Sequence, residues 1–332
     1  MMQKPQVSIL IPCFNAERWL GIAIESALEQ TGPAIEVIVV DDGSTDRSLE
    51  VIRSFEGRIR WESGPNKGAP TTRNRLLQLS RGEWLQFLDA DDYLRPGKIA
   101  TQWAIVAQNP DCDVICSATA CEVMLDGELM TVDEALPEPL DPWILLAHWQ
   151  LPQTGGSLWK KAALQRVGGW RIDQPCCQEH ELYFRMLRDG RRFAYCDGCL
   201  AVYRFWNHGG RISDRLRTEA HRQRLLILGR VEHYLFKTGA LTPARRQAIN
   251  DTRHAEARVL WHSDRDWARA VAQSIRASDR FYIPRNQPHG PTLYSLIYRM
   301  FGFQTAQVLA SWKRQISAAK VLGSNAYDAR LK

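Results

Sequence analysis

The chain has 332 residues, of which 45% are hydrophobic and 24% are charged. This ordinary globular composition excludes a disordered or low-complexity protein and provides material for one large core or two domains. The net charge of +6 is unevenly distributed, because residues 1–210 carry 21 Lys and Arg against 28 Asp and Glu, whereas residues 211–332 carry 22 against 9. The two parts are therefore expected to face different partners.

Neither end of the sequence predicts a targeting or membrane-spanning segment. The N-terminus leads directly into a six-residue strand, which is too short and wrongly flanked for a signal peptide. Near the C-terminus, residues 293–312 are apolar but interrupted by Arg299, Gly302 and Gln304. Eight cysteines without a secretion signal then indicate free thiols in a reducing cytoplasm. The run 196–199 has the Cys spacing of a zinc or redox site, but its position between two strand-like runs favours a hairpin turn.

The first hundred residues alternate between strand and helix. Residues 7–12 and 37–40 are continuous apolar runs, and residues 16–30 between them carry apolar side chains at helical spacing. The alternation continues with a helix at 44–55, a strand at 58–62, a helix at 71–79 and a strand at 83–88. Strands that are apolar throughout are typical of parallel sheets covered on both faces, so this region is predicted to be a doubly wound α/β domain.

The pattern becomes mixed after residue 113 and almost wholly helical after residue 213. Strands are expected near 114–116 and 200–203, with a helix at about 179–188. Residues 207–210, with the sequence Asn-His-Gly-Gly, are typical of a loop and coincide with the change in charge. We therefore expect one domain over residues 1–210 and a basic helical region over residues 211–332.

Acidic residues follow two of the predicted parallel strands. The two clusters are Asp41 with Asp42, and Asp89 with Asp91 and Asp92. Ligands of open α/β sheets bind at the carboxyl ends of strands, so both clusters are expected on one rim. Acids after a strand can also cap the next helix, but here Pro96 provides a first-turn residue several positions later. Oxygen ligands on a turn suit Mg²⁺ or Mn²⁺ that shares its sphere with phosphate oxygens.

Four short motifs occur in an order that resembles glycosyltransferase family 2. They are residues 7–15 (VSILIPCFN), 41–46 (DDGSTD), 66–68 (NKG) with Arg73-Asn74, and 88–92 (LDADD). Four motifs in the family's order are much more specific than any single one. The resemblance covers about residues 5–205 and implies an inverting enzyme of the GT-A fold, an α/β fold with a mostly parallel sheet. Its nucleotide-sugar half would span about 1–110 and its acceptor half about 111–210, followed by the helical C-terminal region.

The resemblance also implies roles for individual residues on the nucleotide side. Asp42 is expected to hold the base or ribose of the nucleotide, and Asp41 to support the same turn. Asp91, with Asp89 nearby, matches the family's Asp-x-Asp motif, which would hold Mn²⁺ or Mg²⁺ against the diphosphate. The other expected nucleotide-side residues are Pro12 and Asn15 in the first loop of the pocket, and Arg73 and Asp89 beside the nucleotide.

The catalytic base is expected at the start of the helix at about 179–188. The family places it in an acidic pair ahead of an acid, an aromatic and a basic residue, and the sequence QEHELYFR from residue 178 fits with Glu179 as the base. Gln178 replaces the usual first acid and Glu179 replaces the commoner Asp, so Glu181 stays open as the alternative. The two glutamates project from roughly opposite helix faces, and Glu179 is favoured because the helix start lies free at the rim.

Glycines and tryptophans upstream of this helix resemble the acceptor side of the family. Gly155 and Gly156 would let the backbone approach a sugar ring, and Trp170 would stack on it. Either Trp159 or Trp170 could equally lie in the core, and for Trp159 the core is the preferred interpretation.

We therefore predict an inverting glycosyltransferase that moves a sugar from a nucleotide-diphosphate sugar to a saccharide or lipid-linked acceptor. Uridine diphosphate is the family's commonest carrier. The expected setting is the synthesis of a cell-surface or extracellular polysaccharide. The alternative is an inactive sugar-nucleotide or glycan-binding protein of the same fold, which the replacement by Gln178 favours. A nucleic-acid module in the basic helices is not expected, because no recognised motif accompanies them.

The basic C-terminal region has the composition of an interface. Aromatic and apolar side chains are dense between residues 294 and 303, with Arg299, Lys313 and Arg314 beside them. This pattern predicts a protein of the cytoplasm that lies peripherally at the inner face of the plasma membrane. Packing of the same side chains back onto the catalytic domain is the open alternative.

Overall fold

The structure is a computed structural model that describes residues 4–125, 128–138, 140–205, 216–285 and 293–328. The chain forms two compact units, Met1–Ile227 and Leu228–Lys332. The boundary predicted near residue 210 falls within 206–215, which lies outside the described residues. Within the described part, no helix combines the length and the hydropathy that a membrane crossing requires.

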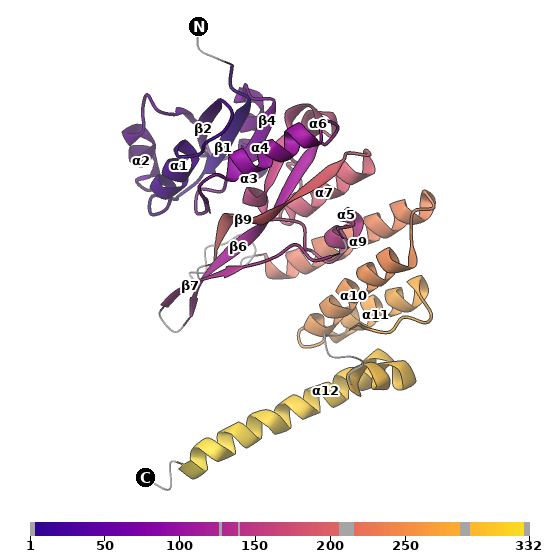
Figure 1. The fold of residues 1–332 in the computed structure, drawn as a ribbon. Helices are drawn as coiled ribbons and strands as arrows, with labels where there is room; N and C mark the ends of the chain where they lie inside the picture. Colours follow the sequence, from indigo (N-terminus) through magenta and orange to yellow (C-terminus); the bar gives the residue numbers. More distant parts are fainter. Residues whose placement is uncertain (1–3, 126–127, 139, 206–215, 286–292, 329–332) are drawn as a thin grey trace. The chain divides into compact units, whose positions relative to one another are not determined.

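The elements of the first unit follow the predicted order (Figure 1). They are β1 (Val7–Cys13), α1 (Leu20–Leu28), β2 (Ile35–Asp41), α2 (Ser48–Ser54), β3 (Arg60–Ser63), α3 (Ala69–Leu79), β4 (Trp84–Phe87), β5 (Tyr93–Leu94), α4 (Lys98–Gln108), β6 (Val114–Leu125), β7 (Glu128–Asp133), α5 (Pro142–Ala147), the 3-10 helix η1 (Thr154–Gly156), β8 (Ser157–Lys160), α6 (Lys161–Arg166), α7 (Gln178–Arg188), β9 (Phe193–Phe205) and the start of α9 (Arg217–Lys237).

The described strands form one nine-stranded sheet in the order β3-β2-β1-β4-β8-β6-β9-β5, with β7 paired to β6. β3, β2, β1 and β4 are parallel, and Ile9 of β1 lies between Val37 of β2 and Gln86 of β4. β8 runs antiparallel to both β4 and β6, whereas β6 and β9 are parallel. The predicted α/β class and the parallel arrangement of the first four strands are confirmed.

Both faces of the parallel strands are buried, which explains their continuous apolar runs. Ile9 and Ile11 of β1 belong to the same core cluster as Ile24 of α1 and Ile52 of α2. Leu10 points to the opposite face, where α3 packs on β1 and β2. The carboxyl ends of β1, β2 and β4 are thereby fixed along one rim between two layers of helices (Figure 1).

The hairpin expected at residues 196–199 is wrong. Cys196 and Cys199 both lie inside β9, which pairs in parallel with β6 and does not reverse there. The register shifts beside Ser117 and Ala118, and Gly198 has a φ of 88°. These features are those of a local irregularity in a long strand. The Asp-Gly pair at residues 197–198 suits such an irregularity as well as it suits a turn. All eight cysteines are free, as expected.

The second unit contains the remainder of α9, α10 (Pro243–Leu260), α11 (Arg265–Ser278) and α12 (Leu293–Asp328). His254 lies at the centre of its aromatic core, with ring centroids 5.3 Å from Tyr298 and 6.1 Å from Phe303. Gly302 interrupts α12 with a φ of 81° and a ψ of −178°. Tyr298 and Phe303 are buried within the unit, whereas Met300 and Phe301 are more than half exposed.

Candidate active site

The turn that follows β2 is held by two buried aspartates. Asp41 accepts hydrogen bonds from the backbone N–H of Ser44 at 3.2 Å and from the hydroxyl of Ser63 at 2.6 Å. The two carboxylate oxygens of Asp42 accept from the backbone N–H groups of Lys67 at 2.8 Å and Gly68 at 2.9 Å. Asp41 therefore stabilises the turn after β2, and Asp42 fastens the 66–68 loop to the rim of the sheet.

The loop after β1 is tied to the same turn through Asn15. This residue has a positive φ of 50°, which Asn tolerates better than most side chains. Its backbone N–H donates to Ser44 Oγ at 2.9 Å, and its side-chain oxygen accepts from the backbone N–H of Thr45 at 2.8 Å. Pro12 pairs with Val40 where β1 and β2 end. The ends of β1 and β2 therefore form one rigid wall of the rim.

Arg73 of α3 is the centre of the rim. Its buried guanidinium donates from Nη2 to Asp89 Oδ1 at 2.7 Å and from Nη1 to Gln178 Oε1 at 2.6 Å. Glu179 Oε1 lies 3.9 Å from the same Nη2. Burial alone would lower the pKa of Arg73, but the carboxylates of Asp89 and Glu179 raise it above its ordinary value. One fixed cation thereby links the acid motif after β4 to the first turn of α7.

Trp170 lies under this cation instead of offering a face to a ligand. The guanidinium carbon of Arg73 is 4.7 Å from the centroid of its indole ring, and Phe87 meets the ring edge-on at 5.2 Å. Only 2% of Trp170 is exposed. The expectation that Trp170 stacks on a sugar is therefore replaced by the core alternative, because protein side chains already cover its ring.

The backbone of Trp170 is clamped by Asn74, which follows Arg73 in the motif. The Asn74 side chain accepts from the Trp170 N–H at 2.8 Å and donates to the Trp170 carbonyl at 2.7 Å. Gly169 makes this approach possible, because a Cβ there would lie 2.5 Å from Asn74 Oδ1 and its φ is 67°. The pair Arg73-Asn74 thus holds the ring and the backbone of one tryptophan.

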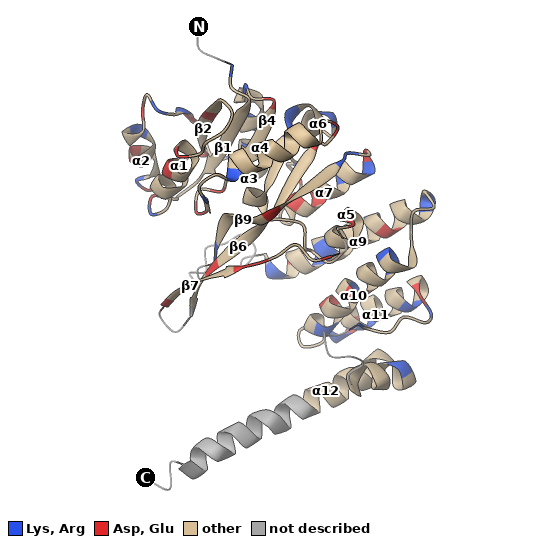
Figure 2. Ribbon diagram, in the orientation of Figure 1, with Lys and Arg blue, Asp and Glu red and all other residues tan. Residues whose placement is uncertain are grey.

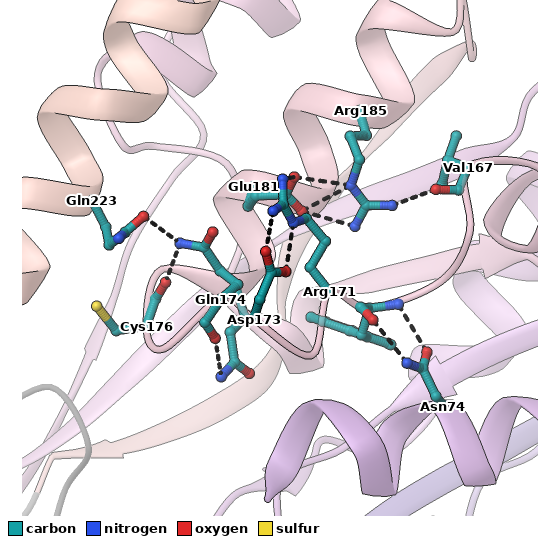
Figure 3. A network of polar contacts seen from close by, with 11 residues as sticks. Asn74, Val167, Arg171, Asp173, Gln174, Cys176, Glu181, Arg185 and Gln223 are labelled. Carbon is teal, nitrogen blue, oxygen red and sulfur yellow. Dashed lines mark hydrogen bonds and ion pairs between the residues drawn. The ribbon is translucent and has the colours of Figure 1, made fainter.

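The two candidate bases at the start of α7 have different surroundings. Glu179 accepts a 2.6 Å hydrogen bond from the Thr154 hydroxyl and faces Arg73, with 17% of its side chain exposed. Glu181 is 2% exposed, and both its oxygens accept from Arg185 Nε, at 3.0 and 2.8 Å, while Arg171 lies 3.9 Å away. Figure 3 shows Glu181 enclosed by Arg185 and Arg171. Glu179 therefore has the accessible carboxylate at the rim.

Gly155 and Gly156 are buried, and the groups that approach them closely belong to the protein. A Cβ at Gly156 would lie 2.5 Å from Pro152 Cβ, and one at Gly155 would lie 3.2 Å from Ala201 Cβ. The expectation that these glycines leave room for a sugar ring is therefore corrected, because the packing around η1 fills that space. Their immediate neighbour Thr154 contacts Glu179, so η1 acts on the rim through Thr154.

A buried lysine lies behind η1. Lys98 Nζ donates to the side-chain oxygens of Gln86 and Gln102, and all three residues are fully buried. The amide nitrogens of these glutamines donate to the carbonyls of Gly155 at 2.9 Å and Gly156 at 3.0 Å. Burial lowers the pKa of Lys98 to about 7. The amide network therefore fixes the backbone beside Thr154.

The acid motif after β4 contains donors of the kind that a divalent ion needs. Asp89 and Asp91 are half-buried, and Asp91 contributes to the raised pKa of Arg73, which places it near the guanidinium. Asp92 is buried and accepts from the backbone N–H of Arg204 at 3.0 Å. Within the described residues, no group of three His, Cys, Asp or Glu side chains forms a complete metal site. Two carboxylates nevertheless fit Mg²⁺ or Mn²⁺, because such ions complete their spheres with phosphate oxygens and water.

Three contributors to the rim were not predicted as site residues. Thr154 contacts the expected base, Lys98 supports the backbone at Gly155 and Gly156 through Gln86 and Gln102, and Gln178 binds Arg73. Thr154 directly precedes Gly155 and Gly156, so the glycine motif in the sequence also indicates this threonine. Lys98 carries no signal, because nothing in the sequence around it distinguishes a buried lysine from an ordinary first-turn residue.

Comparison with known proteins identifies the fold and the motif-bearing part of the chain. The family model described as glycosyl transferase family 2 matches residues 8–154. Residues 8–154 are a glycosyl transferase family 2 domain. The domain supplies the rim from Pro12 to Asp91, whereas Trp170 and Glu179 lie beyond the matched segment.

Relatives of the family 2 domain match only part of their own length. An uncharacterized glycosyltransferase of Haemophilus influenzae is 38% identical over 112 residues, which is 32% of this chain and 45% of that protein. The chain therefore spans less than half the length of this curated relative.

Two solved structures resemble the family 2 domain and much of the remaining chain. S. aureus TarS 1-349 in complex with UDP-GlcNAc is 14% identical with a TM-score of 0.58, and the match covers 93% of this chain and 92% of that one. A mannosyltransferase from Pyrobaculum calidifontis in complex with GDP-Man and Mn²⁺ is 17% identical with a TM-score of 0.51, covering 96% and 87%. At these identities the likeness shows the fold alone, and it confirms the GT-A type.

Proposed function

We propose that the chain transfers a sugar from a nucleotide-diphosphate sugar to an acceptor hydroxyl with inversion of configuration. The observation that carries this proposal is the position of Arg73, which joins Asp89 of the acid motif to Gln178 and Glu179 at the rim. The carboxylate proposed for the donor side, Asp89, and the one proposed for the acceptor side, Glu179, thus both lie beside the Arg73 guanidinium. A single displacement needs such an arrangement, because the base, the anomeric carbon and the leaving diphosphate must lie in line.

Glu179 is the proposed base. Its carboxylate would take the proton of the acceptor hydroxyl as that oxygen attacks the anomeric carbon from the face opposite the leaving group. The hydrogen bond from Thr154 orients the carboxylate, and the Arg73 guanidinium lies 3.9 Å from it. A positioned base contributes about 10²–10⁴-fold to the rate. Its partial exposure leaves it accessible to an acceptor.

Asp89 and Asp91 are the proposed ligands of Mn²⁺ or Mg²⁺. Such an ion, when bound, neutralises the charge that grows on the departing nucleoside diphosphate. Asp89 is held by Arg73, so the guanidinium orients one of the two carboxylates. Asp42, Asn15 and Pro12 form the wall on which the nucleoside is proposed to lie.

A uridine diphosphate sugar is the proposed donor, and a saccharide or lipid-linked saccharide is the proposed acceptor. The TarS complex with UDP-GlcNAc supports the donor by similarity of fold, whereas the mannosyltransferase complex with GDP-Man keeps the guanosine carrier as the alternative. Synthesis of a surface or extracellular polysaccharide is the setting we propose for such a transfer.

The deciding experiment is release of nucleoside diphosphate from UDP-GlcNAc, other UDP-sugars and GDP-mannose in the presence of Mn²⁺. We expect slow hydrolysis of one donor by the wild type and its loss in Asp91→Asn and Glu179→Gln. Glu25→Gln on α1 is the matched control, because Glu25 is exposed and takes part in none of the rim contacts described above. Equal rates in Glu25→Gln and Glu179→Gln would exclude Glu179 as the base.

A non-catalytic protein that binds sugar nucleotides is the second candidate, and Gln178 is the observation that favours it. Metal-dependent binding of UDP in calorimetry without turnover of any donor, with or without saccharide acceptors, would support this candidate. Because Gln178 still provides the oxygen that Arg73 requires, its presence is compatible with an active site as well.

We further propose that the second unit lies on an anionic membrane surface. Leu296, Met300 and Phe301 of α12 are each more than half exposed, and Arg299 stands among them. Exposed apolar side chains next to guanidinium groups suit the boundary between lipid headgroups and acyl chains. Leu296→Ser with Phe301→Ser is expected to weaken sedimentation with phosphatidylglycerol vesicles, and the exposed Val259→Ser on α10 serves as the control. Equal sedimentation of both variants would contradict the proposal.

A further inference from the structure

The second unit contains a cavity of about 560 Å³ that the proposed transfer reaction does not use. Its lining comes from three successive parts of the unit: the end of α11, the segment that follows it, and α12. The lining residues are Arg276, Arg280, Phe281, Tyr282, Ile283, Tyr298 and Arg299. Three of the seven are arginines and none is acidic, so the cavity combines positive charge with aromatic walls.

The three arginines lack acidic partners within the described chain. Elsewhere in this unit arginines meet carboxylates: Arg253 lies 2.7 Å from Glu232 and Arg269 lies 2.8 Å from Asp266. Among the residues that the structure describes, no such ion pair forms at Arg276 or Arg299, and Arg280 lies only over the Phe281 ring, at 5.5 Å. In Figure 2 the Lys and Arg residues in the described part of this unit are drawn in blue. Like charges that converge on one cavity repel one another, and a bound anion removes that repulsion.

The aromatic wall is rigid. Tyr282 donates its hydroxyl hydrogen bond to Asp251 at 2.8 Å, and its ring meets Tyr298 at nearly right angles, with centroids 5.9 Å apart. Burial raises the pKa of Tyr298 to about 12, and the neighbouring Arg276 opposes that rise. Both rings are buried, and these contacts hold them in place in the wall.

The Arg276 guanidinium packs against the kink of α12 at Gly302. Gly302 has a φ of 81°, and a Cβ there would lie 2.5 Å from Arg276 Nη2. A residue with a side chain at position 302 would therefore displace the guanidinium from the kink. The absence of a side chain at this one position lets a cation from α11 pack against α12.

We propose that this cavity binds a phosphate group carried by an apolar or ring-containing moiety. Guanidinium groups bind phosphate through paired, charge-assisted hydrogen bonds, and the buried rings of Tyr282 and Tyr298, with the exposed Phe281, offer surface to the attached moiety. The ligand is either a free organic phosphate or the headgroup of a lipid. This site goes beyond the proposed transfer reaction, because no residue of the rim takes part in it.

The test measures binding of two probes to the full-length protein. Calorimetry with phenyl phosphate, and with phenol as the uncharged counterpart, examines the free phosphate. Sedimentation with phosphatidylcholine vesicles that contain phosphatidic acid, against phosphatidylcholine alone, examines the headgroup. The variants are Arg276→Gln, Arg280→Gln and the double variant, with Arg265→Gln as the control. Arg265 is exposed on the same helix, 11 residues away, which is about 16 Å along the axis.

We expect phenyl phosphate or the phosphatidic acid vesicles to bind, and each pocket variant to weaken that binding by about tenfold while Arg265→Gln leaves it unchanged. Binding of phenyl phosphate identifies a free phosphate as the ligand, and binding of vesicles alone identifies a headgroup. Absence of binding to both probes, or equal weakening in Arg265→Gln, would overturn the proposal.

Arg276 and Arg280 are exposed, so their replacement does not endanger the fold, and unchanged unfolding temperatures check this. None of these outcomes depends on sugar transfer.

Discussion

Arg73 Nη1 donates a 2.6 Å hydrogen bond to Gln178 Oε1, which joins α3 to the first residue of α7 across 105 positions of sequence. Both side chains are buried. Gln178 occupies the position where an acid was expected from the resemblance to family 2. An amide oxygen serves as acceptor here without adding a negative charge, so Asp89 and Glu179 are the carboxylates that balance this guanidinium.

This relationship predicts that position 178 requires an acceptor more than a charge. Gln178→Glu keeps an oxygen within reach of Arg73, so we expect donor hydrolysis to persist and the unfolding temperature to change little. Gln178→Leu leaves Nη1 buried without its acceptor, which costs about 1.5–3 kcal/mol for a charged donor. The measurement is donor hydrolysis together with thermal unfolding of both variants. Comparable loss of turnover in both would mean that the amide itself, and not an acceptor, is required.

Replacement of the two glutamates of α7 is expected to affect different properties, turnover for Glu179 and stability for Glu181. Glu179→Gln removes the proposed base, so turnover should fall about 10²–10⁴-fold while stability changes little. Glu181→Gln weakens the buried pair with Arg185, and we expect it to lower the free energy of unfolding by about 1.5–3 kcal/mol. Urea unfolding and donor hydrolysis of both variants separate the two roles. A large loss of turnover in stable, folded Glu181→Gln protein would reverse the assignment.

Adjacent glycines provide a matched pair for the contact between Asn74 and the backbone of Trp170. Gly168 and Gly169 both have positive φ values, of 84° and 67°, but only Gly169 lies against Asn74. Gly168→Ala is expected to cost about 1–2 kcal/mol from backbone strain alone. Gly169→Ala adds the 2.5 Å clash with Asn74 Oδ1, and we expect a larger loss together with weaker nucleotide binding through Arg73. Equal unfolding free energies for the two variants would show that the Asn74 clamp contributes nothing.

The parallel half of the sheet was predictable because its signals are local. Each strand is a short apolar run, and the rule that strand ends meet at one rim places the residues around Asp41 and Asp89 before any contact is known. The partner of each side chain was not predictable in this way. That Arg73 would bind Gln178, and that Trp170 would lie beneath it, depends on packing between segments roughly a hundred residues apart.

The glycine loop shows why a correct motif can be assigned an incorrect physical reason. Gly155 and Gly156 were selected as positions where backbone meets a sugar, yet close approach by Pro152 and Ala201 explains both glycines fully. Sequence indicates that a side chain is absent, but it does not say which atoms use the space. The same limit applies to Lys98, whose burial depends on the distant strands that surround it.

Lys98 predicts a dependence of stability on pH that a single variant can isolate. Its pKa is lowered by burial to about 7 in the folded chain, against 10.5 for an ordinary lysine. Below pH 7 the side chain is charged in both states, so folding carries the full cost of burying the ammonium. Above pH 7 the folded chain has released a proton that the unfolded chain still holds, so stability rises with pH by up to about 1.4 kcal/mol per unit until the unfolded lysine titrates as well.

Lys98→Met preserves the volume of the side chain but removes both the titration and the donor to Gln86 and Gln102. We expect the stability of the wild type relative to this variant to be constant below pH 7 and to grow between pH 7 and 9. Comparing the two proteins reduces the opposing effect of Cys13 and Cys116, whose pKa values burial raises to about 11 and about 12 in the wild type. Urea unfolding at intervals from pH 6 to 9 provides the measurement. Parallel curves over this range would show that Lys98 stays charged inside the fold.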